Sequence, residues 1–278
     1  MNAQIDAIIK NALAEDIGHG DLTALLCVPA EKESTAILRA KEDGVLAGTD
    51  AFSRVFALLD ERVRVNFLKS DGDALETGKI FCELSGPARS LLTGERTALN
   101  FLQRLSGIAT RTAEAVAKVA GTTARITDTR KTTPGLRVLE KRAVRTGGGA
   151  NHRFGLFDGV LIKENHIAAA GGITAAISAC RAGAPHTAKI EVETKNHAEV
   201  AEAVRAKADI IMLDNMSNED MRQAVEFIAG RALTEASGNM ADRDLREVAK
   251  TGVDIISIGA LTHRIRSVDI SMVFIDEE

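Results

Sequence analysis

From Thr122 onward, short apolar runs rich in β-branched residues alternate with alanine-rich segments of helical pattern. The apolar runs are ARITDTR, GVLIKEN, AKIEVET, DIIMLDN, ALTEASG and DIISIGA. Strands that are apolar along most of their length and joined through helices are typical of a buried parallel sheet. Repeats spaced about 20 to 30 residues apart predict a barrel or partial barrel rather than an open Rossmann sheet. No GxGxxG or GxxxxGK is present, which argues against dinucleotide and P-loop sites.

The residues before Thr122 follow a different pattern. The elements predicted there are an amphipathic helix over 5–13, strands within 34–47 and at 63–68, a helix over 91–105 that ends at Gly107, and a second helix over 110–119 that ends at Gly121. The tail 266–278 alternates and then becomes apolar, so it is predicted to return to the N-terminal region, either as a strand or as a helix.

Positive charge is concentrated in one part of an acidic chain. Residues 125–166 hold nine Lys and Arg against four Asp and Glu, a charge of +5, whereas the whole chain carries −4. Clustered cations raise the local concentration of an anionic ligand. The segment therefore predicts a site for a small, highly charged anion.

The composition excludes several classes of function. The chain has nine Phe but no Trp or Tyr, so it is poorly equipped to stack nucleic-acid bases. No apolar run approaches the roughly 18 residues that cross a bilayer, and the start shows no signal-peptide pattern. Three scattered cysteines, Cys27, Cys82 and Cys180, indicate reduced thiols. We expect a cytoplasmic protein without nucleic-acid or membrane partners.

Polar residues follow the predicted barrel strands one after another. In order, the strand ends carry Asp128, Arg130 and Lys131; Lys163, Glu164 and Asn165; Glu191, Glu193 and Lys195; Asp214 and Asn215; Ser237, Gly238 and Asn239; and Gly259 with Ala260. Active sites of parallel barrels lie at the carboxyl ends of the strands. The sequence therefore predicts an active site at this edge.

These residue types suit anion chemistry. Carboxylates and phosphates are predicted to be bound by five cationic donors, Arg130, Lys131, His152, Arg153 and Lys163. Glu193 and Asp214 are hard oxygen ligands on neighbouring strands, an arrangement typical of Mg²⁺ shared with a diphosphate. Gly238 and Gly259 let backbone amides approach a phosphate after the last two strands.

Other polar residues have simpler interpretations. The basic residues Arg137, Lys141, Arg142 and Arg145 are predicted to form mostly a solvated helix face, and His19 and Asp21 a capped turn. Gly147, Gly148 and Gly149 are predicted to form a flexible loop that presents His152 and Arg153. The single histidines His166, His186 and His197 are expected to be structural or surface residues, and no histidine cluster indicates zinc.

An ordered set of motifs then resembles one family across essentially the whole chain. The motifs are EDIGHGDLT, GERTALNFLQRLSGIAT, DTRKTTPGLR, RTGGGANHR, LIKENH, IEVE, IMLDN, ASGN and IGALTH. Together they resemble the quinolinate phosphoribosyltransferases, which convert quinolinate and phosphoribosyl diphosphate to nicotinate mononucleotide, diphosphate and CO₂ in NAD biosynthesis.

The resemblance implies an α/β fold with two domains. An N-terminal α/β (α+β) sandwich domain would comprise residues 1–107, joined by 266–278, and an open, partial TIM-like α/β barrel would comprise 108–265. It also implies Mg²⁺ as cofactor and a homodimer, or a higher oligomer built from it, in which the partner subunit completes each active site.

The resemblance also implies roles for individual residues. Arg96 would reach into the neighbouring subunit's site, and the quinolinate carboxylates would be bound by Arg130, His152, Arg153 and Lys163. The catalytic set would be Lys131 and Lys163 beside the diphosphate, with Glu193 and Asp214 near the ribose and Mg²⁺. The phosphate end of the barrel would be formed by Ser237, Gly238, Gly259 and His263.

Three other functions are weaker alternatives. A sister group associated with molybdenum transport shares the fold but departs from TRKTTPG and NHR, which are both intact here. A nicotinate phosphoribosyltransferase would need fewer cations around a monocarboxylic acid. A sugar-phosphate or nucleotide sensor on the same barrel would keep the glycines but would not need both Glu193 and Asp214.

Overall fold

The computed structural model describes residues 3–275 and divides into two compact units. The sandwich unit holds the described residues of Met1–Ala113, Thr133–Gly148 and Arg264–Glu278, and the barrel unit holds Glu114–Thr132 and Gly149–His263. The predicted α/β fold class is confirmed. The boundaries predicted from sequence place 108–265 in one continuous barrel domain, whereas Thr133–Gly148 packs here with the sandwich unit.

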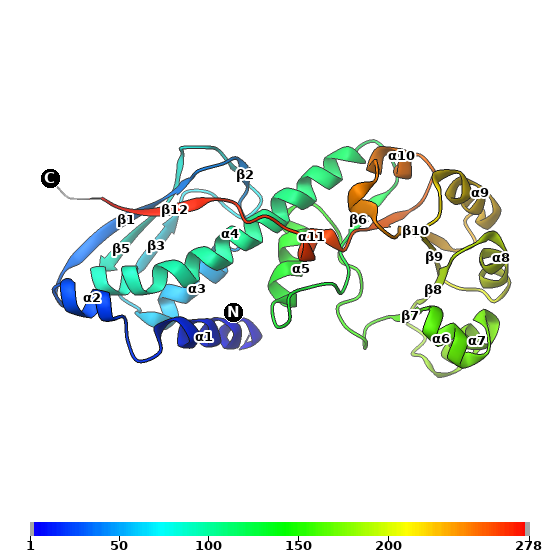
Figure 1. Ribbon diagram of the computed structural model, residues 1–278, viewed down its shortest axis with the longest axis horizontal. Helices are drawn as coiled ribbons and strands as arrows, with labels where there is room; N and C mark the ends of the chain where they lie inside the picture. The colour runs from blue at the N-terminus through cyan, green and yellow to red at the C-terminus, as the bar shows by residue number, and fades with distance from the viewer. Residues whose placement is uncertain (1–2, 276–278) are drawn as a thin grey trace. The chain divides into compact units, whose positions relative to one another are not determined.

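The sandwich unit is built on a four-stranded antiparallel sheet (Figure 1). Its strand order is β12 (Ile270–Ile275), β1 (Glu33–Ala40), β5 (Ile80–Pro87), β3 (Arg64–Phe67). A separate pair joins β2 (Gly44–Val45) to β4 (Ala74–Leu75). The helices are α1 (Ala3–Ile17), α2 (Leu22–Cys27), α3 (Thr49–Leu59), α4 (Ala88–Lys118), which also enters the barrel unit, and α5 (Arg137–Thr146).

Aromatic and aliphatic side chains join the helices to this sheet. The ring of Phe52 on α3 lies 5.5 Å from that of Phe67 on β3, and Phe67 stacks near Phe81 on β5. The helical spacing in the first residues is confirmed, because Ile5 and Ile9 of α1 are buried. Burial of such apolar area is the main term that stabilises this unit.

Gly107 does not end a helix, so the prediction of two helices over 91–119 is wrong. The chain is helical without interruption from Ala88 to Lys118. A Cβ atom at position 107 would lie 2.2 Å from the carbonyl oxygen of Arg266. The glycine is therefore required for close approach of another backbone segment, which a sequence pattern cannot distinguish from a helix stop.

The tail forms a strand, which decides between the two alternatives left by the sequence. β12 pairs antiparallel with β1, with Ile270 opposite Ala40 and Ile275 opposite Thr35. Residues 276–278 of the predicted tail lie outside the described residues. The C-terminal segment therefore completes the sheet that the N-terminal residues begin.

The barrel unit contains the six strands predicted from the apolar runs. They are β6 (Arg125–Thr127), β7 (Val160–Ile162), β8 (Ile190–Thr194), β9 (Ile210–Asp214), β10 (Leu233–Ser237) and β11 (Ile255–Ser257). Their order in the sheet is β6-β11-β10-β9-β8-β7, all parallel. β6 and β7, the first two strands of this unit, therefore lie at opposite edges of the sheet, so the barrel is open.

Helices cover the outer face of these strands (Figure 1). They are α6 (Glu164–Ala170), α7 (Ile173–Gly183), α8 (His197–Arg205), α9 (Asn218–Ile228) and α10 (Leu245–Ala249). Two short helices, η1 (Met240–Asp242) and α11 (Ala260–His263), follow β10 and β11. Val192 and Leu213 are fully buried. The neighbouring positions Glu191, Glu193 and Asp214 alternate with them and belong to the inner face.

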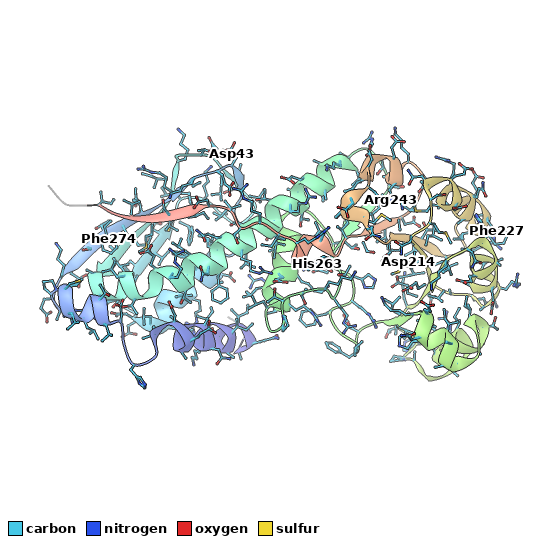
Figure 2. All side chains as sticks on the ribbon, viewed as in Figure 1. Asp43, Asp214, Phe227, Arg243, His263 and Phe274 are labelled. Atoms are coloured by element: carbon cyan, nitrogen blue, oxygen red, sulfur yellow. The ribbon has the colours of Figure 1, made fainter. Side chains whose placement is uncertain are left out.

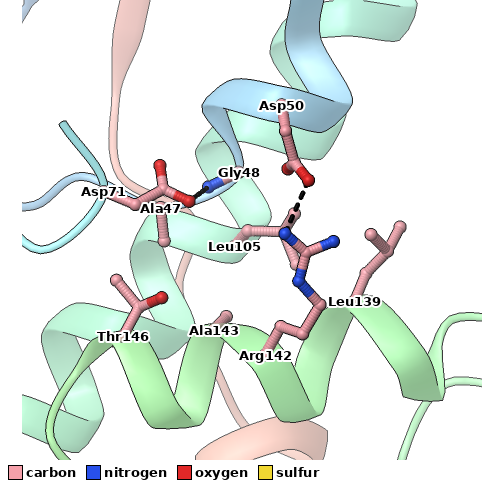
Figure 3. A pocket seen from close by; sticks show the side chains of 9 residues that line it. All are labelled: Ala47, Gly48, Asp50, Asp71, Leu105, Leu139, Arg142, Ala143 and Thr146. Carbon is pink, nitrogen blue, oxygen red and sulfur yellow. Dashed lines mark hydrogen bonds and ion pairs between the residues drawn. The ribbon is translucent and has the colours of Figure 1, made fainter. Parts of the chain in front are cut away.

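The basic helix α5 is only partly a solvated face. Arg142 and Arg145 are exposed, as predicted, but Lys141 is 3% exposed. Arg142 forms an ion pair with Asp50 at the edge of a small pocket within the sandwich unit (Figure 3). Asp71 closes another side, because it accepts hydrogen bonds from the backbone N–H groups of Gly48 and Thr49 at the start of α3. The helix therefore serves the packing of this unit.

Within residues 3–275, no helix is both long enough and apolar enough to cross a membrane.

Candidate active site

The polar ends of the barrel strands lie along one edge of the parallel sheet. Asp214, at the end of β9, is on the inner side of the curved sheet, whereas Phe227 of α9 belongs to the outer layer (Figure 2). Because all six strands run in the same direction, their carboxyl ends meet at one rim. The ring of charged strand ends inferred from sequence is therefore present.

Lys131, Gly259 and His263 come together on one part of this rim. A Cβ atom on Gly259 would lie 2.8 Å from Cδ of Lys131 and 3.3 Å from Nε2 of His263. The Thr262 hydroxyl donates to the Lys131 carbonyl oxygen over 2.7 Å, which fixes the backbone that carries the lysine. Lys131 and His263 are exposed, so their side chains can reach an anion here.

Lys163 and Glu193 form a second group at the opposite edge of the sheet. Lys163 follows the edge strand β7, and Glu193 belongs to the neighbouring strand β8. Lys163 Nζ lies 3.6 Å from Glu193 Oε2, and the lysine side chain is 53% exposed. The backbone N–H of Lys163 donates to Nδ1 of His166, which holds the start of α6. His166 is therefore a structural residue, as predicted. The contact with Glu193 places the lysine beside an inner-face carboxylate.

Asp214 and Gly238 are held together through Asn215. Asn215 has a left-handed backbone with a φ of 55°, and its side-chain amide donates to Asp214 Oδ2 over 2.8 Å. Its backbone N–H donates to the Ser237 carbonyl oxygen. Gly238 has a φ of +91°, and a Cβ there would lie 2.2 Å from Asn215 Oδ1. Only glycine fits this conformation and this space.

The segment with His152 and Arg153 is anchored by Asp128. The Asp128 carboxylate is fully buried and accepts from the backbone N–H of His152 over 2.8 Å and from the Asn151 amide over 2.6 Å. Residue 150 also forms a bridge to Thr127. The segment after the three glycines is therefore fixed at its backbone at this point, and Asp128 is an anchor for the cations.

Arg130 and Arg153 bring two guanidinium groups into one region. Burial lowers the pKa of Arg153, the charge of Arg130 lowers it further, and Glu191 and Asp158 oppose the shift. The Arg153 side chain donates to the Gly159 carbonyl oxygen over 3.0 Å, and its buried Nε has no hydrogen-bond partner among the described residues. Two cations that disfavour each other are stabilised when an anion binds between them.

A buried acidic cluster lies inside the barrel, and the sequence did not predict it. His152 Nε2 lies 3.1 Å from Glu191 Oε2 and 3.6 Å from Glu235 Oε2, with the two glutamates 3% and 1% exposed. Glu191 was expected at a strand end but is a buried inner-face residue. Glu235 lies in the middle of β10, where the only signal is one acid in a strand that is otherwise uncharged.

Arg96 is the one predicted site residue outside the barrel unit. It is an exposed residue of α4, in the part of that helix that belongs to the sandwich unit. The remaining predicted site residues, from Arg130 to His263, all lie in the barrel unit. Among the residues set aside by sequence, Asp21 caps α2 as predicted, because its side chain accepts from the Ala24 N–H.

Two family descriptions cover almost the whole chain. Residues 21–106 match the N-terminal domain of quinolinate phosphoribosyl transferase, and residues 108–273 match its C-terminal domain. This chain belongs to the quinolinate phosphoribosyltransferase family. Membership confirms the resemblance carried by the sequence motifs and makes the chain a phosphoribosyltransferase.

Relatives and solved structures agree with this membership. The chain is 47% identical over 269 residues to the probable nicotinate-nucleotide pyrophosphorylase (carboxylating) of Bacillus subtilis (strain 168), covering 97% of this chain and 93% of that protein. Nicotinate-nucleotide pyrophosphorylase from Ehrlichia chaffeensis superposes with a TM-score of 0.94 at 39% identity, over 99% and 100% of the two chains. The enzyme from Francisella tularensis gives 0.93 at 43% identity, over 99% and 97%.

Proposed function

We propose that this quinolinate phosphoribosyltransferase joins quinolinate to phosphoribosyl diphosphate and releases nicotinate mononucleotide, diphosphate and CO₂ in de novo NAD biosynthesis. The observation that carries the proposal is the composition of the barrel rim. The cations Lys131, Lys163 and Arg153 and the acids Glu193 and Asp214 lie at the same end of the barrel. The two substrates together present two carboxylates, a 5′-phosphate and a diphosphate, which match a cationic rim.

The residues divide by the charge that they meet. The quinolinate carboxylates are assigned to Arg130, His152, Arg153 and Lys163, and the 5′-phosphate to Ser237, Gly238, Gly259 and His263. Ser237 and Gly238 lie beside Asn215, while Gly259 and His263 adjoin Lys131, so phosphate groups would bind along the last strands.

The reaction needs charge stabilisation more than proton transfer. As the bond from the ribose C1 to diphosphate breaks, positive charge grows on the ribose, and the quinolinate nitrogen forms the new bond to C1. Lys131 and Lys163 stabilise the departing diphosphate, and Glu193 and Asp214 stabilise the cationic ribose. The carbon–carbon bond to the adjacent carboxylate then breaks with release of CO₂, its electrons enter the cationic ring, and a proton from water takes its place.

The donor set of Glu193 and Asp214 fits Mg²⁺. The two acids lie on adjacent strands, and within residues 3–275 they are not part of a closed group of three or more possible ligands. Such an open pair suits an ion that takes its other ligands from diphosphate and water. Bound there, Mg²⁺ would neutralise part of the diphosphate charge.

Arg96 supports a homodimer with shared sites. The residue is exposed on α4, in the GERT motif that in this family supplies an arginine to the neighbouring site. Its charge would complete the cationic surroundings of the quinolinate carboxylates. The same helix exposes Leu92, and the short helix α2 exposes Leu22 and Leu26, which are 73% and 84% exposed. An apolar surface of this kind is typical of a subunit contact.

The activity is tested by incubating the protein with quinolinate, phosphoribosyl diphosphate and Mg²⁺ and measuring nicotinate mononucleotide, diphosphate and CO₂ in equal amounts. Nicotinate in place of quinolinate is the matched control, because it lacks the second carboxylate. We expect product from quinolinate only. Product from nicotinate at a comparable kcat/KM would favour the monocarboxylic alternative.

Shared sites are tested by mixing two inactive variants, Arg96→Ala and Lys163→Ala. In a homodimer whose sites take Arg96 from the partner, a mixed dimer contains one site with both residues intact. Random exchange of subunits should therefore restore about one quarter of the wild-type activity. Native mass spectrometry verifies that subunits have exchanged. If activity is then not recovered, the shared site is contradicted, while the proposed reaction is not affected.

A further inference from the structure

The cluster of His152, Glu191 and Glu235 places two buried carboxyl groups beside one imidazole. Glu191 and Glu235 approach from β8 and β10, on either side of β9, where Met212 lies opposite Glu235 in the strand register. All three side chains offer ligand atoms within 4.8 Å of one another. The Oε1 atom of each glutamate is buried and has no hydrogen-bond partner among the described residues.

The protonation of His152 follows from its contacts. The backbone N–H of Arg153 donates to His152 Nδ1 over 2.7 Å, so Nδ1 acts as an acceptor and carries no proton. The ring proton is then on Nε2, which faces Glu191 Oε2 at 3.1 Å. A metal-bound histidine would need the reverse arrangement, with a free lone pair on Nε2 and a proton on Nδ1. The cluster is therefore joined by hydrogen bonding through Nε2–H and not by a metal ion.

Glu235 is left without a full counter-charge in this arrangement. The imidazole proton is directed to Glu191, and the 3.6 Å from Nε2 to Glu235 Oε2 exceeds a hydrogen bond. Two ionised carboxylates cannot share a water-poor interior without a large electrostatic cost. Neutralising one of them with a proton removes that cost.

We infer that Glu235 is a positioning residue that holds a proton in the resting enzyme and thereby keeps the His152–Arg153 segment ready for an anionic substrate. The inference rests on the proposed function, in which this segment binds the quinolinate carboxylates.

The groups around Glu235 account for its protonation. Burial raises the pKa of Glu235 to about 7, and the charge of Glu191 adds to the rise. Against this act His152, the Ser257 side chain on β11 and Lys163 at the end of β7. The single charge left on Glu191 also acts on the Arg153 guanidinium, whose pKa it raises.

Binding of a dianion must therefore be linked to this proton. When the carboxylates of quinolinate approach Arg153 and His152, they add negative charge near Glu235 and favour its protonated form further. Near neutral pH, binding then takes up a proton from solution. Above that pH, binding must first protonate Glu235, and affinity falls with rising pH.

Glu235→Gln separates this linkage from a merely structural role. Glutamine has the shape of the protonated acid and cannot ionise. We expect wild-type quinolinate affinity, measured by calorimetry on the whole enzyme without the second substrate, to weaken roughly three- to tenfold between pH 7 and 8.5. The variant should show little change and should bind more tightly than wild type at pH 8.5. Damaged packing would give weaker binding at every pH.

Glu226→Gln is the matched control, since Glu226 is an exposed residue of α9 and the same substitution there should leave the wild-type pH dependence intact. Proton uptake is read from binding heats in two buffers of different ionisation enthalpy at pH 7. We expect uptake in the wild type and in Glu226→Gln and none in Glu235→Gln. Equal uptake in all three proteins would overturn the inference.

Glu191→Gln keeps the test decisive if Glu235→Gln does not fold. Removing the neighbouring charge lowers the pKa of Glu235, so proton uptake at pH 7 should fall and move to lower pH. Unchanged uptake in that variant would also overturn the inference. Absence of quinolinate binding to the wild-type enzyme at any pH would instead contradict the proposed function.

Discussion

The rim and the interior of the same barrel use charge in opposite ways. At the rim, Lys163 is half exposed and is 3.6 Å from Glu193, a loose pair that solvent and ligands can enter. In the interior, Asp128 and Glu191 are almost completely buried and face hydrogen-bond donors at 2.6–3.1 Å. Both sets come from the barrel strands or the residues that follow them. Asp128 and Lys163 each directly follow a strand, so burial and not position along the strand separates the two uses.

The difference shows what each set contributes. A rim charge loses little free energy when no ligand is bound, because water solvates it, and it acts on whatever anion arrives. An interior charge must be paired or protonated in every state of the protein. Interior groups therefore fix backbone positions and protonation, while rim groups meet the substrates. The predictions below test this division.

The largest effect is expected from Lys163→Ala at the rim. Removing a cation that stabilises the departing diphosphate should lower kcat by about a thousandfold. The melting temperature should stay close to the wild-type value, because the side chain is half exposed. Steady-state kinetics and thermal unfolding measure both. Lys250→Ala is the control, since that lysine pairs with Glu247 on the outer helix α10. Near-wild-type turnover in Lys163→Ala would remove this residue from the catalytic set.

Asp128→Asn in the interior should act first on stability. Asparagine keeps the shape but loses the charge that accepts from the His152 N–H and the Asn151 amide. Hydrogen bonds to charged groups contribute about 1.5–3 kcal/mol, so the free energy of unfolding, measured by thermal unfolding, should fall by about that amount. The KM for quinolinate should rise. Asp43→Asn is the matched control, because the exposed Asp43 accepts from the backbone and side chain of Thr77. A fall in kcat without loss of stability would erase the distinction between interior and rim.

The smallest effect is expected in the pH dependence of stability. The pKa of Glu235 is raised to about 7 in the folded protein from 4.5, so the folded state binds the proton more tightly than the unfolded state does. Its contribution to stability is fully present below about pH 4.5 and is lost as pH rises through about 7. Glu235→Gln should lack this decline and should melt at a higher temperature than wild type at pH 8, relative to their difference at pH 5. Parallel melting curves across that range would show that Glu235 does not titrate there.

The sequence pattern predicts the barrel strands well, but it does not predict the structural role of individual glycines. The six apolar runs each form a strand of one parallel sheet, because burial on both faces leaves a local signature. Gly107 was interpreted as a helix end, yet it lies inside α4 against the Arg266 carbonyl. Gly238 was assigned to phosphate approach, and the structure adds its packing against Asn215. A glycine reports a need for space, but not which neighbour requires it.

Among the charged residues, the exposed site residues could be predicted from the sequence, and the burial of the others could not. The exposed cations Lys131 and Lys163 could be selected from sequence because strand ends converge in any parallel barrel. Lys141 was placed on a solvated face and is buried. The sequence does not single out Glu235, because one acid in an otherwise uncharged strand has no partner visible nearby in the sequence.

The sequence by itself determined the strand order along the chain, the direction of the strands and hence the rim where charge collects, since these depend on local periodicity and composition. It also carried the family through an ordered set of motifs. Only the tertiary structure decided which charges are buried and what they contact. His152 meets Glu191 and Glu235 from positions 39 and 83 residues away in the chain. Burial raises the pKa of Glu235, and burial is a property of the folded packing that no local pattern encodes.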